Sequence, residues 1–370
     1  MDDIICIGCG AKLQSDDPKE AGYLPASRLK KALESEAEAN DLYCQRCFRL
    51  RHYNEIMPVD VDNDDFLALL NSLAEKKALI VNVVDLFDFT NSLLSSMKRF
   101  VGDNELILVG NKFDLFPLNS RESKIKDWMR QEANRVGLFP KKIFLVSAAK
   151  KKNLTDLIAY LDKKSRNEDV YFVGMTNVGK STLLNAIIDQ MGDIKNLITT
   201  SRFPGTTLDR IEIPLENGHF LVDTPGIMSE NQLATHLNPQ DLAAISPQKP
   251  LKPATYQLKP GNTLFLAGLG RIDYLKGEPT SFTVYVARDL YVHRTKTENA
   301  DEFYQKHVGD LLTPPSEGEN LPALKGQEMH TTYKSDVLFG GIGFITVPAD
   351  CLVKIYTPDK IGLGIRRALI

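Results

Sequence analysis

The chain has 370 residues, of which 43% are hydrophobic and 25% are charged, and its formal net charge is −3 at pH 7. This length predicts two or three domains, and the composition excludes a mainly disordered, fibrous or membrane-embedded protein. The near balance of 45 basic and 48 acidic residues excludes a bulk attraction to nucleic acid or anionic lipid, so any such partner must be met by a local patch.

The start of the chain predicts no export. Residues 1–5 are acidic and apolar, and they lack the basic start and the apolar run of a secretory signal. The longest apolar stretches, such as 78–84, fall far short of the ~18 residues that a membrane span needs. We therefore expect a cytoplasmic protein without a membrane partner.

Residues 1–56 are predicted to form a zinc-binding module. They hold two pairs of cysteines, Cys6 with Cys9 and Cys44 with Cys47. Without an export signal, four thiolates in two short knuckles favour a structural zinc ion over disulfides. The separation of the pairs exceeds the commoner spacing of ~15–20 residues, so an inserted helix should loop out between them. Redox dithiols and buried unpaired thiols are the alternatives.

Residues 57–237 are predicted to form a doubly wound, mainly parallel α/β sheet, because strand-like apolar runs alternate with helical patterns. The runs are 78–85, 105–110, 142–147 and 169–174, and the helical patterns are 120–136, 153–164 and 180–190. The later runs 210–215 and 219–222 flank Asn217 and Gly218, a pair that is typical of hairpins. An antiparallel edge pair should therefore join the sheet.

Residues 238–370 are predicted to form a separate β-rich domain. Alternating runs occur at 263–268, 281–287 and 351–356, with one helix at 298–308 and a loop at 313–326. Aromatic and basic residues interleave, as they do in platforms for single-stranded RNA, although strand alternation alone gives the same pattern. These residues are Tyr285, Arg288, Tyr291, His293, Arg294 and Lys296.

The segment from Gly174 to Ser181 fits the phosphate-binding pattern of glycine, four residues, glycine, lysine and a hydroxyl residue. A strand leads into it and a helix leads out, so backbone N–H groups and the helix N-terminus would surround phosphate oxygens. Lys180 would reach the outer phosphates and Ser181 would ligate magnesium. The expected contacts are Gly174, Asn177, Val178, Gly179, Lys180, Ser181 and Thr182. A glycine turn that binds nothing is the alternative.

A second motif follows a strand at Asp223 to Gly226. The Asp223 carboxylate would hold magnesium through water, and the Gly226 amide would contact a terminal phosphate. Between the two motifs, Thr206 and Thr207 offer hydroxyls that would complete the magnesium coordination when a third phosphate is present. We expect Thr207 to do so, by a narrow margin over Thr206.

A base-reading site is predicted upstream, where Asn111, Lys112 and Asp114 follow one strand and Ser147 and Ala148 follow another. The carboxyl ends of parallel strands share one edge of a sheet, where ligands bind. A carboxylate at Asp114 would accept hydrogen bonds from N1–H and the exocyclic amine of guanine together, and adenine has neither donor there. Such a polar match can reject the wrong base by ~10⁴.

With these motifs the chain resembles the circularly permuted GTPases of the YqeH type. An ordinary GTPase begins with the phosphate loop, whereas here the order is Asn111–Asp114, Ser147–Ala148, Gly174–Ser181, Thr207 and Asp223–Gly226. Joining the old ends and cutting elsewhere preserves every spatial neighbour. The resemblance covers nearly the whole chain. It implies GTP hydrolysis coupled to assembly of the small ribosomal subunit or its precursor, with ribosomal RNA as a partner and GTP or GDP, Mg²⁺ and Zn²⁺ as cofactors.

Ile227 stands where many signalling GTPases place the glutamine that orients the attacking water. The chain thus resembles GTPases with a hydrophobic residue there, some of which hold a potassium ion through a phosphate-loop asparagine, here Asn177. The expected catalytic residues are Asn177, Lys180, Thr207, Asp223 and Gly226. We expect slow hydrolysis that potassium and a ribosomal partner stimulate.

Two other functions remain open. One is a P-loop ATPase or kinase, and the other is a zinc-dependent RNA-binding scaffold whose nucleotide is never turned over.

Overall fold

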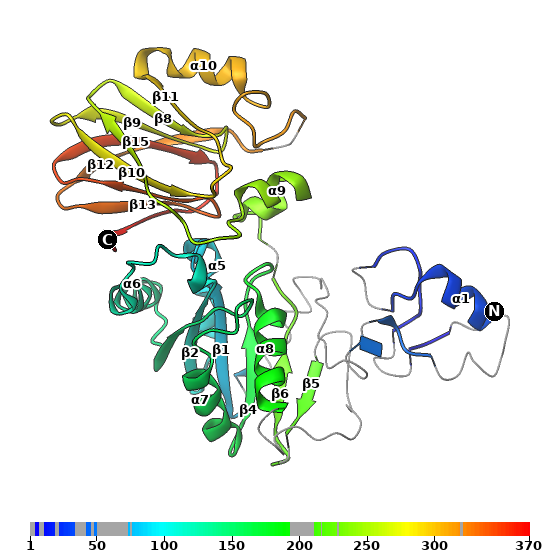
Figure 1. Ribbon diagram of the computed structural model, residues 1–370. Helices are drawn as coiled ribbons and strands as arrows, with labels where there is room; N and C mark the ends of the chain where they lie inside the picture. Colours follow the sequence, from blue (N-terminus) through cyan, green and yellow to red (C-terminus); the bar gives the residue numbers. More distant parts are fainter. Residues whose placement is uncertain are drawn as a thin grey trace. The chain divides into compact units, whose positions relative to one another are not determined.

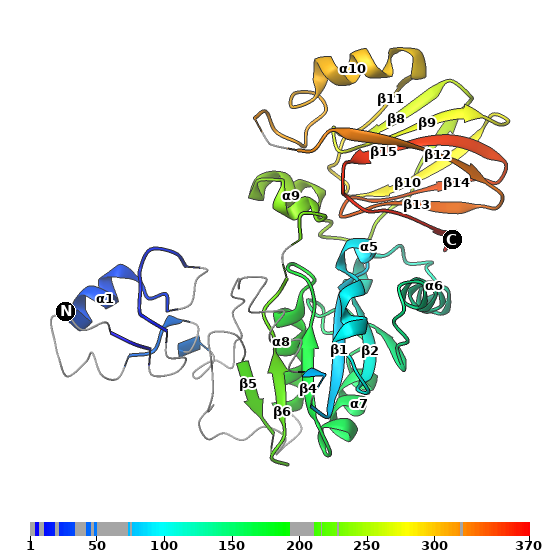
Figure 2. The same ribbon diagram turned by 180° about the vertical axis from the view of Figure 1, so that it is seen from behind.

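The computed structural model describes residues 4–6, 11–18, 22–33, 42–45, 48–49, 73–74, 76–192, 211–215, 217–227, 229–318 and 321–370. It divides into two compact units, drawn from opposite sides in Figures 1 and 2. Unit 1 comprises Met1–Asp85, Leu93–Lys112 and Arg130–Met228, and unit 2 comprises Leu86–Ser92, Phe113–Met129 and Ser229–Ile370. In the part of the chain that the structure describes, no helix is long and apolar enough to cross a membrane.

Unit 1 is built on a six-stranded sheet of order β3-β2-β1-β4-β6-β5. Its strands are β1 (Ala78–Asp85), β2 (Glu105–Asn111), β3 (Lys142–Leu145), β4 (Asp169–Val173), β5 (Ile211–Pro214) and β6 (Phe220–Asp223). All neighbours are parallel except β5, which pairs with β6 in antiparallel register at the edge. The predicted runs and the edge hairpin are confirmed, although β3 ends two residues before Ser147.

The helices of unit 1 include α1 (Ala26–Leu33), η1 (Ser95–Arg99), α7 (Thr155–Ser165) and α8 (Lys180–Gly192). Helices α7 and α8 lie against the same face of the sheet (Figures 1 and 2). Helix α7 buries Leu157, Ile158 and Leu161, whose spacing places them on one side of a helix. Every residue of β1 is buried, which explains why all of them except Asn82 and Asp85 are apolar. β1 lies between β2 and β4, the strands that lead into the Asn111 motif and the phosphate loop.

Unit 2 contains two antiparallel five-stranded sheets, of orders β16-β13-β14-β10-β7 and β11-β8-β9-β15-β12. Their strands are β7 (Ala254–Leu258), β8 (Asn262–Leu266), β9 (Gly270–Lys276), β10 (Thr280–Val286), β11 (Val292–Lys296), β12 (Leu324–Thr331), β13 (Ser335–Phe339), β14 (Gly343–Val347), β15 (Cys351–Pro358) and β16 (Leu363–Arg367). Tyr274, Phe282 and Phe339 are fully buried in their common core. The predicted β-rich character is confirmed.

The remaining elements of unit 2 are short. They are α5 (Phe89–Ser92), η2 (Phe113–Leu115), η3 (Leu233–Thr235), α9 (Pro239–Ile245), η4 (Thr297–Asn299) and α10 (Ala300–His307), while α6 (Glu122–Arg135) runs from unit 2 into unit 1. Helices α6 and α10 confirm the predicted patterns. The predicted loop 313–326 is wrong at its end, because β12 begins at Leu324 and pairs there with Pro358 of β15.

Two segments from the first half of the chain belong to unit 2, where residues of loops beside β7 and β16 hold them. The backbone N–H of Gly362 donates to Asn91 Oδ1 at 3.0 Å, which secures the segment 86–92. The N–H of Leu251 donates to the carbonyl of Leu115 at 2.9 Å, which secures the segment 113–129. Both segments follow strands of the unit 1 sheet directly, β1 and β2.

Candidate functional site

The predicted phosphate loop joins β4 to α8, and the conformation of its backbone explains why glycines stand at two of its positions. Gly179 has φ +83°, and a Cβ there would lie 2.4 Å from Asn111 Nδ2. A Cβ on Gly174 would lie 2.6 Å from the carbonyl oxygen of Val83. Asn177 also has a left-handed backbone, with φ +63°. Both glycines are thus sterically required.

The start of α8 leaves amides for a ligand. The N–H of Leu183 donates to the carbonyl of Gly179 at 2.9 Å, so the amides of Lys180, Ser181 and Thr182 precede this helical bond. Amides at a helix N-terminus attract anions through their N–H groups and the helix dipole. The loop thus fits a bound phosphate chain.

Lys180 and the predicted magnesium ligands lie together. The Lys180 ammonium contacts the Asp223 carboxylate and the Thr224 carbonyl oxygen. Both charged side chains are buried, with 7% and 6% of their surface exposed. Ser181 Oγ lies 3.4 Å from the second Asp223 oxygen. A hydroxyl and a carboxylate are hard oxygen ligands, so this pair fits Mg²⁺.

The segment after Asp223 is attached to the phosphate loop by backbone hydrogen bonds. The N–H of Thr176 donates to the Ile227 carbonyl at 2.8 Å, and the Ile227 N–H donates to the Gly174 carbonyl at 3.3 Å. A Cβ on Gly226 would lie 3.2 Å from Thr176 Cα, so glycine permits this close approach. Thr206 and Thr207 lie outside the described residues.

Asn111 connects three predicted motifs. Its Nδ2 donates to the Val178 carbonyl at 2.9 Å, in the phosphate loop. Its Oδ1 accepts from the Ala148 N–H at 3.0 Å, in the loop after β3. Ser147 Oγ accepts from the Lys150 N–H at 3.1 Å, which fixes that loop. One buried amide thus ties together segments that are far apart in the sequence.

Lys112 and Asp114 fall on either side of the boundary between the units. Lys112 has φ +66°, and its Nζ lies 2.5 Å from the Asp85 carboxylate. From the sequence we assign Asp85 no role and miss this pair, although a carboxylate ending the strand beside β2 is a signal. Asp114 lies in η2, which belongs to unit 2. Its place opposite a guanine therefore stays a prediction.

Two of the four predicted zinc ligands are described, and they lie together. Cys6 and Cys44 are both buried in a small cluster with Leu13 and Leu24, and the Cys44 N–H donates to Cys6 Sγ at 3.2 Å. Cys9 and Cys47 lie outside the described residues, and no group of three or more metal-ligating side chains occurs within them.

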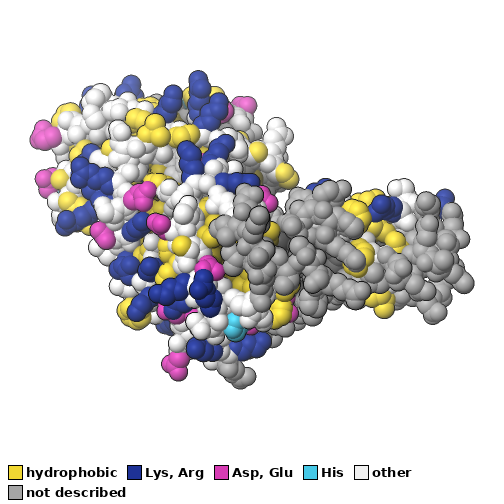
Figure 3. Space-filling view, turned by 60° about the horizontal axis from the view of Figure 1, so that its bottom comes forward, with side chains coloured by type: hydrophobic (Ala, Val, Ile, Leu, Met, Phe, Trp, Pro, Cys, Tyr) yellow, Lys and Arg dark blue, Asp and Glu magenta, His cyan; other side chains and the backbone are white. Residues whose placement is uncertain are grey.

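The aromatic and basic residues from Tyr285 to Lys296, in β10, β11 and the loop between them, do not form one surface. Tyr285 is buried against Phe344, with ring centroids 4.5 Å apart. His293 stacks on Phe303 at 4.3 Å. The exposed members are Arg288, Tyr291, Arg294 and Lys296. Lys and Arg side chains are spread widely over the face drawn in Figure 3, with Asp and Glu among them.

Two protein-family models match the chain. Residues 279–369 match the model described as "YqeH-like, C-terminal", and residues 169–249 match the model described as "50S ribosome-binding GTPase". The second match covers β4, the phosphate loop, α8, the edge hairpin and α9.

Relatives match over most of the chain. It is 44% identical to the Bacillus subtilis (strain 168) protein "Uncharacterized protein YqeH", with the whole of both chains covered. It is 32% identical to the Arabidopsis thaliana "NO-associated protein 1, chloroplastic/mitochondrial", over 92% of this chain and 69% of that protein. The crystal structure of YjeQ from Thermotoga maritima is 25% identical, covering 41% of this chain and 48% of that one, with a TM-score of 0.26.

Proposed function

The chain belongs to the YqeH family of GTPases, and from this premise we propose that it binds GTP and GDP at the phosphate loop and hydrolyses GTP during ribosome assembly. The observation that carries the proposal is the position of Asn111. Its amide joins the loop after β2 to the phosphate loop and to the Ser147–Ala148 loop, so the motifs meet although their order along the chain is permuted.

Each predicted residue then has a role. Backbone amides from Asn177 to Thr182 would hold the phosphates, and Lys180 would turn its ammonium to the outer ones. Ser181, Asp223 and Thr207 would hold Mg²⁺, which supplies charge neutralisation at the phosphate oxygens. Asp114 would accept from guanine, with Asn111, Lys112 and the Ser147–Ala148 loop beside it.

Hydrolysis would be slow without a partner. Ile227 has no group that can orient water, so the transition-state charge must be offset in another way. We propose that Asn177, which is exposed in the phosphate loop, helps to hold a potassium ion for this purpose. A ribosomal partner would accelerate the reaction further.

Nucleotide competition tests the binding proposal. Calorimetry should show binding of GDP and GTP in Mg²⁺ and none of ADP or ATP at the same concentrations. Tight binding of ATP would instead favour a metabolic ATPase or kinase. Binding of GTP without turnover, even with ribosomal subunits present, would favour the zinc-dependent RNA-binding scaffold.

The partner that we propose is the small ribosomal subunit or its precursor, contacted through ribosomal RNA by the zinc module and by exposed basic residues such as Arg288, Arg294 and Lys296. The description of one matching family model names the other subunit, the 50S. Co-sedimentation with each purified subunit, under GDP and under a non-hydrolysable GTP analogue, shows whether the chain binds the small subunit or the 50S subunit. We also propose a cytoplasmic location, which fractionation of cells would test.

A further inference from the structure

Arg366 of β16 is a buried cation whose guanidinium is only partly hydrogen-bonded. Its Nε lies 3.1 Å from the Asp336 carboxylate, on the neighbouring strand β13. That carboxylate also accepts from the Thr346 hydroxyl and the Leu369 N–H. Among the described residues, Nη1 and Nη2 of Arg366 have no hydrogen-bond partner. A buried guanidinium in this state needs another source of stabilisation.

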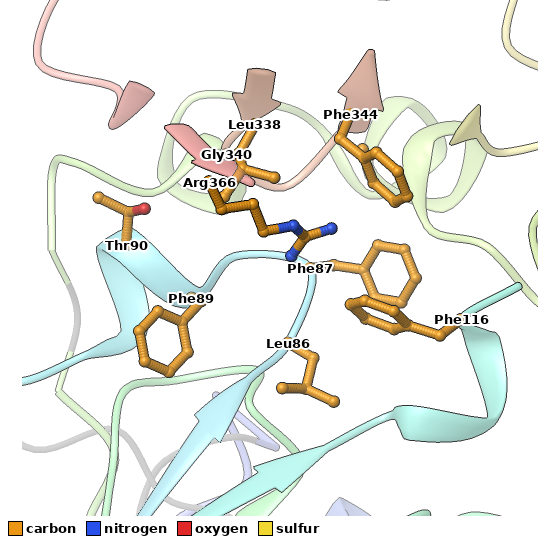
Figure 4. Close-up of a pocket in the computed structure, with 10 residues that line it drawn as sticks. Leu86, Phe87, Phe89, Thr90, Phe116, Leu338, Gly340, Phe344 and Arg366 are labelled. Atoms are coloured by element: carbon orange, nitrogen blue, oxygen red, sulfur yellow. The ribbon is translucent and has the colours of Figure 1, made fainter. Parts of the chain in front are cut away.

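Aromatic rings stabilise the buried guanidinium of Arg366. The Arg366 guanidinium carbon lies 4.6 Å from the ring centroid of Trp128, 4.8 Å from that of Phe344 and 5.6 Å from that of Phe116. Figure 4 shows the guanidinium directed to the side where the rings of Phe87, Phe116 and Phe344 gather. A cation over aromatic faces is attracted by their quadrupoles, and the attraction is stronger when both are shielded from water.

The space beside the guanidinium is too small for a ligand. The cavity that these side chains line holds about 10 Å³, which is at most the room of one water molecule. Arg366 therefore acts as a packing element and not as an anion-binding residue.

Two of the three rings come from the segment that follows Asp114 directly. Phe116 is two residues after Asp114 and contacts Phe344 of β14, with centroids 6.4 Å apart. Between them in sequence, the Leu115 carbonyl accepts from the Leu251 N–H at 2.9 Å. Farther along, Lys124 Nζ donates to the carbonyls of Ala368 and Leu369. The loop before β7 and the residues after β16 thus hold η2 and the start of α6.

The base-reading motif is consequently anchored by two different parts of the chain. Asn111 is held within unit 1, by Val178 and Ala148. Asp114 is part of η2, whose flanking residues are held within unit 2. We propose that Arg366 is a positioning residue for guanine recognition, which fixes η2 through Phe116 and Trp128 and so sets the direction of the Asp114 carboxylate. This inference rests on the proposed GTP-binding function.

The test compares GDP with inosine diphosphate, which lacks only the 2-amino group. Arg366→Lys keeps a positive charge beside Asp336 but loses the planar group over the rings. We expect the GDP-to-IDP affinity ratio to fall ~10-fold or more, because IDP can lose only the hydrogen bond from N1–H to Asp114, whereas GDP loses that bond and the one from its 2-amino group. Phe116→Leu should give the same pattern with a smaller risk to folding.

Arg271→Lys is the matched control. Arg271 is also buried, pairs with Asp273 and lies over the rings of Phe265 and Tyr356, in the other sheet of unit 2. Its replacement should lower the melting temperature as Arg366→Lys does, but leave the GDP-to-IDP ratio unchanged. Calorimetry of the full-length chain measures all three variants.

The possible outcomes separate the two proposals. If the wild-type chain binds no GDP, the proposed function fails and the inference falls with it. If the wild type prefers GDP to IDP but folded Arg366→Lys and Phe116→Leu keep that preference, the inference alone is wrong. An equal loss of GDP and IDP affinity would also overturn it, because a general loss of structure acts on both nucleotides.

Discussion

The side-chain amide of Asn111 donates to the carbonyl oxygen of Val178 at 2.9 Å, across a separation of 67 residues. Val178 lies in the phosphate loop, and Asn111 ends the strand β2. This hydrogen bond lets the polypeptide carry its nucleotide motifs in permuted order and still bring them together. Replacing Asn111 should therefore disturb phosphate binding as well as recognition of the base.

Asn111→Ala should weaken binding of GDP and GTP by ~10-fold or more. The substitution leaves the Val178 carbonyl and the Ala148 N–H without this partner in a buried place, at a cost of about 1–3 kcal/mol each. Calorimetry should show the loss for both nucleotides. Asn167→Ala is the control, because Asn167 is exposed in the same unit and should behave as wild type. Unchanged affinity in Asn111→Ala would contradict the role that we assign to it.

Lys180→Met should reduce GTP hydrolysis by ~10²-fold or more, because it removes the cation that would lie on the outer phosphates. It also leaves the buried Asp223 carboxylate without its ammonium partner. Single-turnover assays at saturating GTP measure the effect on the chemical step. Lys163→Met, on the exposed side of α7, is the matched control. Hydrolysis at the wild-type rate in Lys180→Met would remove Lys180 from the catalytic residues.

Potassium should accelerate GTP hydrolysis relative to sodium at equal ionic strength, and Asn177→Ala should abolish the difference while both rates remain measurable. The reason is that a cation beside the phosphates would offset the charge that develops on them. Steady-state assays in the two chloride salts give the answer. Equal wild-type rates in both salts would rule out a potassium site at Asn177.

Local signals made unit 1 predictable. The phosphate loop, its flanking strand and helix, and the edge hairpin each lie within a short stretch of sequence, so glycine spacing and apolar periodicity were sufficient. Helix α9 also had a local signal, since Asn238 caps it through the Asp241 N–H and Pro239 follows. From the sequence we place a domain boundary at residue 238 and predict no helix there, so we miss α9.

Long-range packing could not be predicted in the same way. No periodicity indicates that Arg366 packs on Trp128, or that Leu251 donates to Leu115, because these partners are distant in the chain and their pairing depends on the finished fold. The start of β12 at Leu324 could not be predicted for the same reason. Its first residues are strand-like only through their register with β15.

Cys44→Ser should remove zinc from the chain while nucleotide binding persists. Three protein ligands would remain, and a structural zinc site with one ligand lost binds its metal far more weakly. Metal analysis should find about one zinc ion per wild-type chain and much less in Cys44→Ser. Cys351→Ser is the control, because Cys351 lies in β15 of unit 2. Equal zinc contents in the wild type and Cys44→Ser would contradict the predicted module.

Glu105 should make stability depend on pH. Burial raises the pKa of Glu105, but hydrogen bonds from Lys164 and Tyr160 outweigh burial and hold this pKa below its ordinary value. Because the folded pKa is depressed, the stabilisation is present above the unfolded pKa and is lost as the pH falls through the folded one. Glu105→Gln should therefore lower the free energy of unfolding by about 1 kcal/mol at neutral pH, and the difference from wild type should shrink as the pH falls through the depressed pKa of Glu105. Urea unfolding across this range measures it, with the more exposed Glu122→Gln as the control. A difference that stays constant down to acid pH would show that the charge of Glu105 is not its source.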